Sequence, residues 1–282
     1  MTSMTSMTSM TNMTSMTGSI RESTRTALRR LRLSGMSETL ETRLAEAAGN
    51  RLGHEEFLEL ILQDELAIRG DRQVGRRTKA AQFRDQRSLA DFDWTFNTSV
   101  KRRQIEELAT CRFVREGGDV LLRGPPGTGK SHIAQALGTH AIRAGFDVLY
   151  RSVFDLVRDF LHDEAVAGSE KVISRYLRPD LLIIDDMGMK QLPKRSGEYL
   201  FEIVLRRHER RSTLMTSNRP LTDWGKLLGD VPSATAILDR FLHRAVLIEI
   251  NGRSYRLKDR AAEVAKAEET CGDTPAAGRK RA

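Results

Sequence analysis

The sequence has little cysteine and no long apolar run. Its 282 residues include 2 cysteines, Cys111 and Cys271, and neither belongs to a CxxC pair. Isolated cysteines are typical of proteins from reducing compartments, and they argue against a cysteine-ligated zinc site. The longest apolar runs, such as Leu181–Ile184, are far shorter than the roughly 18 residues that cross a bilayer. We therefore expect a cytoplasmic protein with no membrane partner.

The composition is that of a basic globular protein. Charged residues make up 30% of the chain and hydrophobic residues 39%, which is enough apolar content to build a core. Lys and Arg number 46 against 38 Asp and Glu, giving a net charge of +8. Clustered cations gain free energy when they release counterions from nucleic acid, so DNA is a candidate partner. The alternative is a basic protein without a polyanionic partner.

Residues 1–90 divide into a low-complexity leader and a helical region. The leader, residues 1–19, repeats a Met-Thr-Ser triplet and is expected to be disordered because it cannot form a core. Residues 20–90 are expected to form a small helical domain. Its apolar residues recur at four-residue steps in two runs, Met36, Leu40, Leu44 and Leu58, Leu62, Leu66.

A basic stretch follows in the same region. The cations considered as DNA-phosphate contacts are Arg72, Arg76, Arg77 and Lys79. An ordinary solvated helix face is an equally weighted alternative for such a charge run.

Residues 91–257 have the alternating texture of an α/β domain. Short apolar runs separated by helical stretches predict a mainly parallel sheet covered by helices on both faces. The expected strands include Val120–Leu122, Val148–Tyr150, Leu181–Ile184, Leu214–Thr216 and Val246–Ile250. Residues 258–282 form a charged tail that is expected to be disordered.

The strongest motif is GPPGTGKS, which fits the P-loop pattern GxxxxGK[ST] and directly follows an apolar strand. Glycines allow successive backbone amides to face phosphate oxygens, and the following helix contributes its positive N-terminal end. Lys130 should reach the β- and γ-phosphates, and Ser131 should offer its hydroxyl to Mg²⁺. The motif therefore predicts a site for MgATP formed by Gly124, Pro125, Pro126, Gly127, Thr128, Gly129, Lys130 and Ser131.

Two later strands end in polar residues suited to the same site. The strand LLII is followed by Asp185, a candidate Mg²⁺ ligand, and Asp186, a candidate for activating the attacking water. Asp186 could instead hold the metal ligands in position without activating water, or cap a helix. Asn218 follows the next strand and could contact the γ-phosphate or orient the water, as Thr216 or Ser217 could; a simple strand-ending Asn is the alternative.

Several blocks together resemble the IstB-like ATPases, AAA+ helpers of transposition related to DnaC-type helicase loaders. The resemblance covers Leu28 to Leu257 and rests on the P-loop segment, LLIIDDMG, TSNRP followed by Trp224, AILDRFLHRA and GRSYRLK. It implies an AAA+ P-loop core after a small helical domain, MgATP as cofactor, and ATP-dependent assembly on duplex DNA. It also implies a transposase partner, encoded by the adjacent gene.

The resemblance places Arg240 in the position of an arginine finger that completes the ATP site of a neighbouring subunit, with Arg244 in reserve. An ion pair with Asp239 is the alternative. Little chain follows the last expected strand, so no full lid domain is expected. Arg256 is considered a phosphate contact; packing at the end of the sheet or exposure at the surface is the favoured alternative. His208 stands where the resemblance favours an aromatic residue, usually Tyr.

The preferred hypothesis is an ATPase that assembles on duplex DNA and assists a transposase in insertion-sequence transposition. Hydrolysis is expected to be slow because Asp186 stands where AAA+ proteins more often carry Glu, and DNA and oligomerisation are expected to stimulate it. The alternatives are a helicase loader acting in replication and a nucleotide-dependent switch with little turnover. Three aromatic residues before the core, Phe92, Trp94 and Phe96, either pin the helical domain to it or approach adenine or DNA bases.

Overall fold

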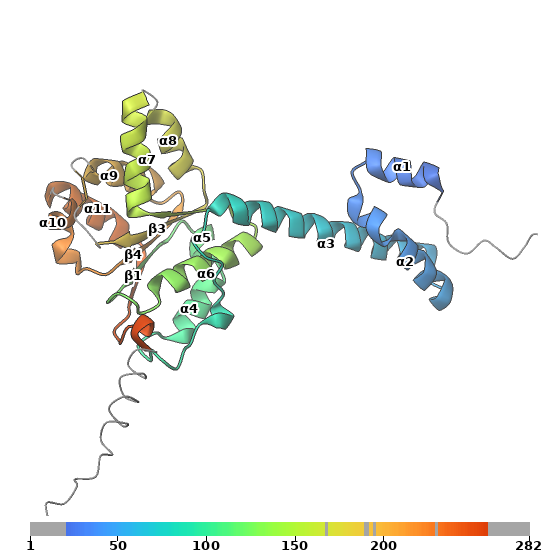
Figure 1. Cartoon of the computed structure of the whole chain (residues 1–282), viewed down its shortest axis with the longest axis horizontal. Coiled ribbons are helices and arrows are strands. Elements are labelled where there is room, and N and C mark those ends of the chain that lie inside the picture. The colour runs from blue at the N-terminus through green and yellow to red at the C-terminus, as the bar shows by residue number, and fades with distance from the viewer. Residues whose placement is uncertain (1–20, 167–168, 189–191, 194–195, 229–230, 259–282) are drawn as a thin grey trace, which may run out of the picture. The chain divides into compact units, whose positions relative to one another are not determined.

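A computed structural model describes residues 21–166, 169–188, 192–193, 196–228 and 231–258 (Figure 1). The Met-Thr-Ser leader and the tail beyond Lys258 lie outside these residues, so the expectations about them and about a lid stay predictions. The chain divides into two compact units, residues 1–76 and 77–282. This division comes earlier than residue 90, where the sequence texture changes.

The first unit is helical, as predicted. Its apolar centre consists of Met36, Leu40 and Ile61 from two different helices. Glu65 is buried beside them, and its carboxylate accepts a hydrogen bond from the Met36 amide at 3.0 Å. The helices are α1 (Glu22–Arg30), α2 (Ser34–Asn50) and α3 (His54–Ala81), of which α3 contains the division between the units.

The second unit is built on a parallel sheet of 5 strands in the order β2-β3-β4-β1-β5. This confirms the predicted α/β fold. Its central strands are buried on both faces, as their continuous apolar sequences require. The strands are β1 (Asp119–Arg123), β2 (Val148–Ser152), β3 (Leu181–Met187), β4 (Ser212–Ser217) and β5 (Ala245–Glu249).

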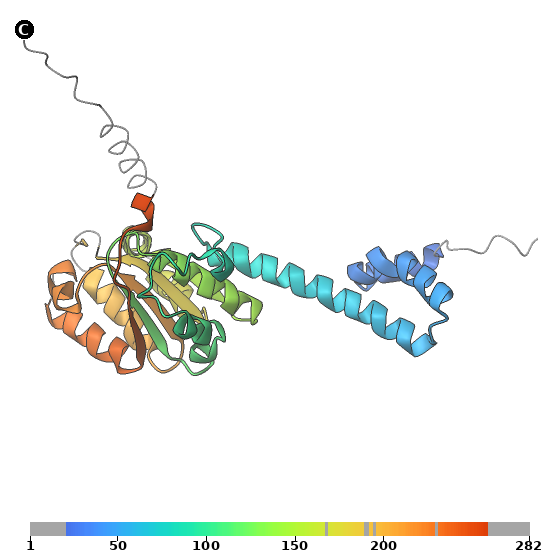
Figure 2. The ribbon, with the colours of Figure 1, turned by 90° about the horizontal axis from the view of Figure 1, so that it is seen from below.

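Helices cover both faces of the sheet (Figures 1 and 2). Right-handed crossovers place α6 (Lys130–Arg143) on one face, since the chain moves from β1 to β2 in the direction opposite to its later steps. The later connections lie on the other face. They comprise α7 (Val153–Val166), α8 (Ser169–Leu177), α9 (Ser196–Arg207), α10 (Trp224–Leu228) and α11 (Val231–His243).

Shorter elements precede β1, follow β4 and follow β5. The single turns are η1 (Leu89–Asp91), η2 (Leu221–Asp223) and η3 (Tyr255–Leu257), and the short helices are α4 (Arg102–Ala109) and α5 (Arg112–Arg115). Cys111 joins α4 to α5 and is 1% exposed. Burial raises the pKa of its thiol, so Cys111 is a packing residue rather than a nucleophile.

A buried arginine fixes the end of α9. Arg207 is 1% exposed, and its guanidinium donates hydrogen bonds to the carbonyl oxygens of Tyr176 and Pro179, each at 2.9 Å. It also donates to Ser212 O and to the Thr213 hydroxyl. One planar cation therefore ties α9 to the turn before β3 and to the start of β4.

We expect Arg207→Met to lower the free energy of unfolding by about 3–5 kcal/mol. The buried carbonyl oxygens would lose their hydrogen-bond donor, and the acidic groups near Arg207 would lose their buried positive partner. For a protein of this size that corresponds to a fall in Tm of roughly 10 °C. Thermal unfolding followed by circular dichroism measures it. The control is Arg206→Met, because Arg206 is exposed and forms an ion pair with Glu202 at 3.2 Å; equal shifts for both variants would contradict the anchoring role.

Candidate nucleotide-binding site

The loop between β1 and α6 requires glycine at two positions. Gly127 and Gly129 have φ angles of 78° and 96°, in the left-handed region. A Cβ atom on Gly127 would lie 2.0 Å from Ser254 Oγ, and one on Gly129 would lie 2.6 Å from Phe92 Cε2. The loop thus leads into the first turn of α6, where free backbone amides and the helix dipole favour an anion.

The ammonium group of Lys130 lies within this loop. Its Nζ donates a hydrogen bond to Pro125 O at 2.6 Å, and the residue is 8% exposed. Burial lowers the pKa of this ammonium group, while the charges of Asp185 and Asp186 act in the opposite direction. A phosphate oxygen would provide the anionic partner that best stabilises a buried ammonium.

Asp185 joins three elements at the carboxyl ends of the strands. It is fully buried, and its Oδ1 accepts hydrogen bonds from Ser131 Oγ at 3.0 Å and from the Thr216 hydroxyl. Its Oδ2 accepts from Tyr150 OH at 2.5 Å. Burial and the Asp185 charge raise the pKa of Tyr150, which keeps the phenol protonated and donating. The structure thereby brings together the two predicted Mg²⁺ ligands, Ser131 and Asp185.

These two residues fit a magnesium ion chemically. A hydroxyl and a carboxylate side by side are hard oxygen donors of the kind that Mg²⁺ prefers, next to a loop shaped for phosphates. Because Tyr150 and Thr216 already hold Asp185 in one orientation, the carboxylate is ready to bind the ion directly or through water.

Asp186 turns toward the cavity at an irregular point of β3. The register between β3 and β4 shifts between Ile184 and Met187, and Asp186 has a φ of 63°, which is unusual for a residue other than glycine. Burial and the neighbouring Asp185 raise the pKa of its carboxyl group, whereas Arg84 Nη2, 3.3 Å from Oδ2, acts against this rise. Asp186 lies inside a strand, so it does not cap a helix.

A cavity of about 420 Å³ adjoins the loop. Asp186 and Asn218 both line it; the backbone amide of Asn218 donates to Met187 O at 3.2 Å just beyond β4. Arg256, which is exposed, also lines it. The predicted residues in its wall are Pro126, Gly127, Thr128, Gly129, Lys130, Ser131, Asp186, Thr216, Asn218 and Arg256.

The rest of the wall comes largely from residues outside the P-loop and the strand-end motifs. The segment before the core contributes Arg84, Asp85, Arg87, Asp91 and Asp93. The aromatic residues are Phe92, Phe96 and Tyr255, of which the first two belong to the alternating aromatic pattern. Their apolar rings border the cavity next to the phosphate loop, where a nucleotide base would lie.

The aromatic pairs hold these rings in place. The Phe92 ring lies 4.8 Å from that of Trp94 and 5.3 Å from that of His132, on α6. The Phe96 ring lies 5.0 Å from that of Tyr255, on η3. The aromatic segment thus packs against α6 and η3 of the second unit, and Phe92 and Phe96 border the cavity as well.

Arg240 is not among the residues that line this cavity. It lies in the last turn of α11, which leads into the start of β5, whereas the cavity lies beyond the carboxyl ends of the parallel strands. Arg240 therefore does not contact the nucleotide cavity of its own chain. The ion pair with Asp239 considered from the sequence is not among those of the described residues.

The candidate DNA contacts fall into two groups. Arg72 pairs with Glu38 at 3.1 Å in the first unit, and Arg77 pairs with Asp147 at 2.8 Å in the second. Arg76 and Lys79 have exposed side chains. Among the described residues, no helix is both long and apolar enough to cross a membrane.

Comparison with known proteins places these observations in a family. A family model described as IstB-like ATP binding protein matches residues 26–263. The predicted ATP-binding protein of insertion sequence IS21 from Pseudomonas aeruginosa is 36% identical over 233 residues, covering 83% of this chain and 88% of that protein. The corresponding protein of insertion sequence IS5376 from Geobacillus stearothermophilus is 33% identical over 231 residues, covering 82% and 92%.

Solved structures agree on the fold of the core. A crystal structure of the DnaC helicase loader has a TM-score of 0.50 and 22% identity, covering 60% of this chain and 98% of that one. The structure of DnaI also has a TM-score of 0.50, at 23% identity, covering 58% and 91%. At this identity the likeness shows the fold alone. The family match and the curated relatives show that the chain is a member of the IstB-like ATP-binding proteins.

Proposed function

We propose that the protein is a Mg²⁺-dependent ATPase that assembles on duplex DNA and assists a transposase during insertion-sequence transposition. The observation that carries the proposal is the meeting of Lys130, Ser131 and Asp185 beside the P-loop and the cavity. The similarity to ATP-binding proteins of insertion sequences supports the transposition context. The net charge of +8 supports DNA as a partner.

The residues of the cavity suit phosphoryl transfer to water. Lys130 and the loop amides bind the β- and γ-phosphates, and Ser131 and Asp185 would hold Mg²⁺, which would supply positive charge against the phosphates. Asp186 orients a water molecule and accepts its proton as the oxygen bonds to the γ-phosphorus. The bond to the β–γ bridging oxygen breaks, leaving ADP and phosphate. Burial raises the pKa of the Asp186 carboxyl group, the direction that favours acceptance of a proton.

Subunit assembly would complete the site. Arg240 lies away from its own cavity, so a role for it in hydrolysis requires the cavity of a neighbouring subunit. Arg256 already lines the cavity and is placed to contact phosphate in the same chain. ATP binding would therefore favour an oligomer, and phosphate contacts from many subunits would add up to tight binding of DNA. Arg76 and Lys79 are the exposed candidates for these contacts.

The test uses Asp186→Asn in the full-length chain. We expect ATP-dependent binding to duplex DNA to persist and ATP turnover to fall about 100-fold or more, because general-base catalysis contributes about that much. Gel shifts and phosphate release measure the two effects, with Asp85→Asn as a matched control from the cavity wall. Undiminished turnover would refute the role of Asp186, and preference for single-stranded DNA would favour the helicase-loader alternative.

A further inference from the structure

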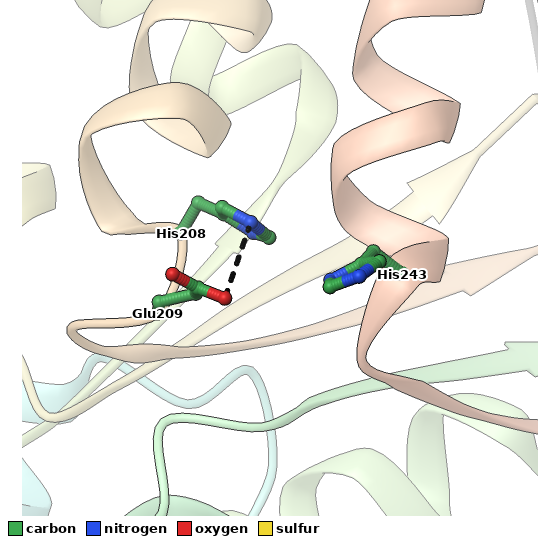
Figure 3. Close-up of side chains that lie close together, drawn as sticks. All are labelled: His208, Glu209 and His243. Carbon is green, nitrogen blue, oxygen red and sulfur yellow. Dashed lines mark ion pairs between the residues drawn. The ribbon is translucent and has the colours of Figure 1, made fainter.

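Two histidines and a glutamate meet away from the nucleotide cavity. His208 directly follows α9, Glu209 is the next residue, and His243 is the last residue of α11 (Figure 3). One ligand atom from each of the three residues lies within 4.8 Å of the others. The two imidazole rings lie 5.9 Å apart between centroids. None of the three residues lines the nucleotide cavity.

The fold holds these residues at one place for reasons independent of the nucleotide site. Helices α9 and α11 pack side by side, and each leads into a parallel strand, so their C-terminal ends lie at the same edge of the sheet. Glu209 has a φ of 59°, which ends α9 and turns its side chain toward the histidines. Arg207, the last residue of α9, is held by hydrogen bonds to the carbonyl oxygens of Tyr176 and Pro179, and this fixes the backbone directly before His208.

The local electrostatics favour a cation. Carbonyl groups at a helix C-terminus carry partial negative charge, and here two C-termini converge. The Glu209 carboxylate adds a full negative charge. Arg244 Nη1 lies 4.0 Å from Glu209 Oε1, so one cation of the chain already competes for this carboxylate.

His208 has an unused hydrogen-bonding capacity. Its Nδ1 is buried and has no hydrogen-bond partner among the described residues. Its Nε2 lies 4.0 Å from Glu209 Oε1, which is too long for a hydrogen bond. Nε2 is therefore the His208 nitrogen that lies near Glu209 and is available to bind a metal ion there.

We propose that His208, Glu209 and His243 form a binding site for a divalent transition-metal ion, with Zn²⁺ as the best match. Two imidazoles and a carboxylate form a ligand set that suits zinc, whereas Mg²⁺ and Ca²⁺ prefer oxygen ligands throughout. Ligands about 2.1 Å from a tetrahedral ion are roughly 3.4 Å apart, so small rotations of exposed side chains close the site. Water would fill the fourth position. The ion would link the ends of α9 and α11.

The experiment titrates Zn²⁺ into untagged full-length protein without nucleotide, followed by calorimetry, and repeats it with Co²⁺ followed by visible absorption. We expect one ion per chain. His243→Ala and His208→Phe should each weaken Zn²⁺ binding at least about 100-fold, beyond the 10–100-fold loss usual for residues that only support a ligand. His54→Ala, which removes a histidine from the first unit, should leave the affinity unchanged.

A further variant separates metal binding from simple packing. Arg244→Gln should strengthen Zn²⁺ binding several-fold, because it removes the cation that competes for Glu209. The His208→Phe variant keeps a ring in the half-buried position, and circular dichroism reports whether each variant is folded. The proposal is overturned if the folded wild type takes up no Zn²⁺, or if it binds no more tightly than His208→Phe and His243→Ala.

Discussion

A Lys130→Ala variant should bind MgATP at least about 100-fold more weakly than the wild type. Lys130 is expected to donate charge-assisted hydrogen bonds to two phosphates, each worth about 1.5–3 kcal/mol, and 1.4 kcal/mol is a factor of ten. ATP-dependent binding to duplex DNA should disappear at the same time, because the proposed assembly on DNA requires bound nucleotide. Displacement of a fluorescent ATP analogue measures the first effect, and gel shifts measure the second.

The control for this substitution is Lys101→Ala. Lys101 is exposed and does not line the cavity, so its loss removes the same charge without touching the site. Folding of the Lys130→Ala protein is not expected to suffer, since burial already disfavours the charged form of this side chain. Unchanged ATP affinity in Lys130→Ala would refute its assignment.

An Arg240→Ala variant should behave differently. We expect nucleotide binding by the isolated chain to stay within about twofold, because Arg240 does not line its own cavity. Turnover should fall by about 10³ or more, the amount that an arginine finger contributes when it meets the developing phosphate charge. Steady-state phosphate release measures turnover, and size-exclusion chromatography with and without ATP measures assembly.

A mixing experiment tests whether Arg240 acts on a neighbour. Arg240→Ala protein keeps an intact P-loop, and Lys130→Ala protein keeps an intact Arg240. Mixed oligomers should therefore contain some complete sites and recover part of the activity. Absence of any recovery, in mixtures shown to assemble, would count against action between subunits. Arg244→Ala serves as the comparison, because Arg244 is the second candidate for the arginine finger and its guanidinium lies 4.0 Å from Glu209 Oε1.

The strands of the second unit can be predicted from the sequence because each contains a short apolar run that is visible without knowledge of the fold. Apolar runs such as Leu181–Ile184 are buried on both faces, and a strand of that kind needs little further context. The helical unit is harder. Met36 and Leu40 are buried, but Leu58, Leu62 and Leu66 are 53%, 45% and 69% exposed. Four-residue spacing therefore identifies the helices there without identifying which face packs.

The site divides in a similar way. The P-loop and Asp185 are recognised because short motifs carry a fixed backbone geometry with them. Arg84 and Arg87 belong to no such motif, and only the tertiary fold brings them to the cavity. The direction of Asp186 likewise depends on the irregularity of β3, which alternation along the strand does not reveal. The alternating pattern of Phe92 and Phe96 does indicate two of the aromatic residues that line the cavity.

Calorimetric titration of MgATP into the folded full-length chain tests the central claim most directly. The claim is that the loop of residues 124–131, together with Asp185, binds a magnesium triphosphate. We expect a saturable heat corresponding to one nucleotide per chain, with weaker binding once EDTA has removed the metal. A protein that is folded by circular dichroism and yet gives no heat with MgATP would contradict this account.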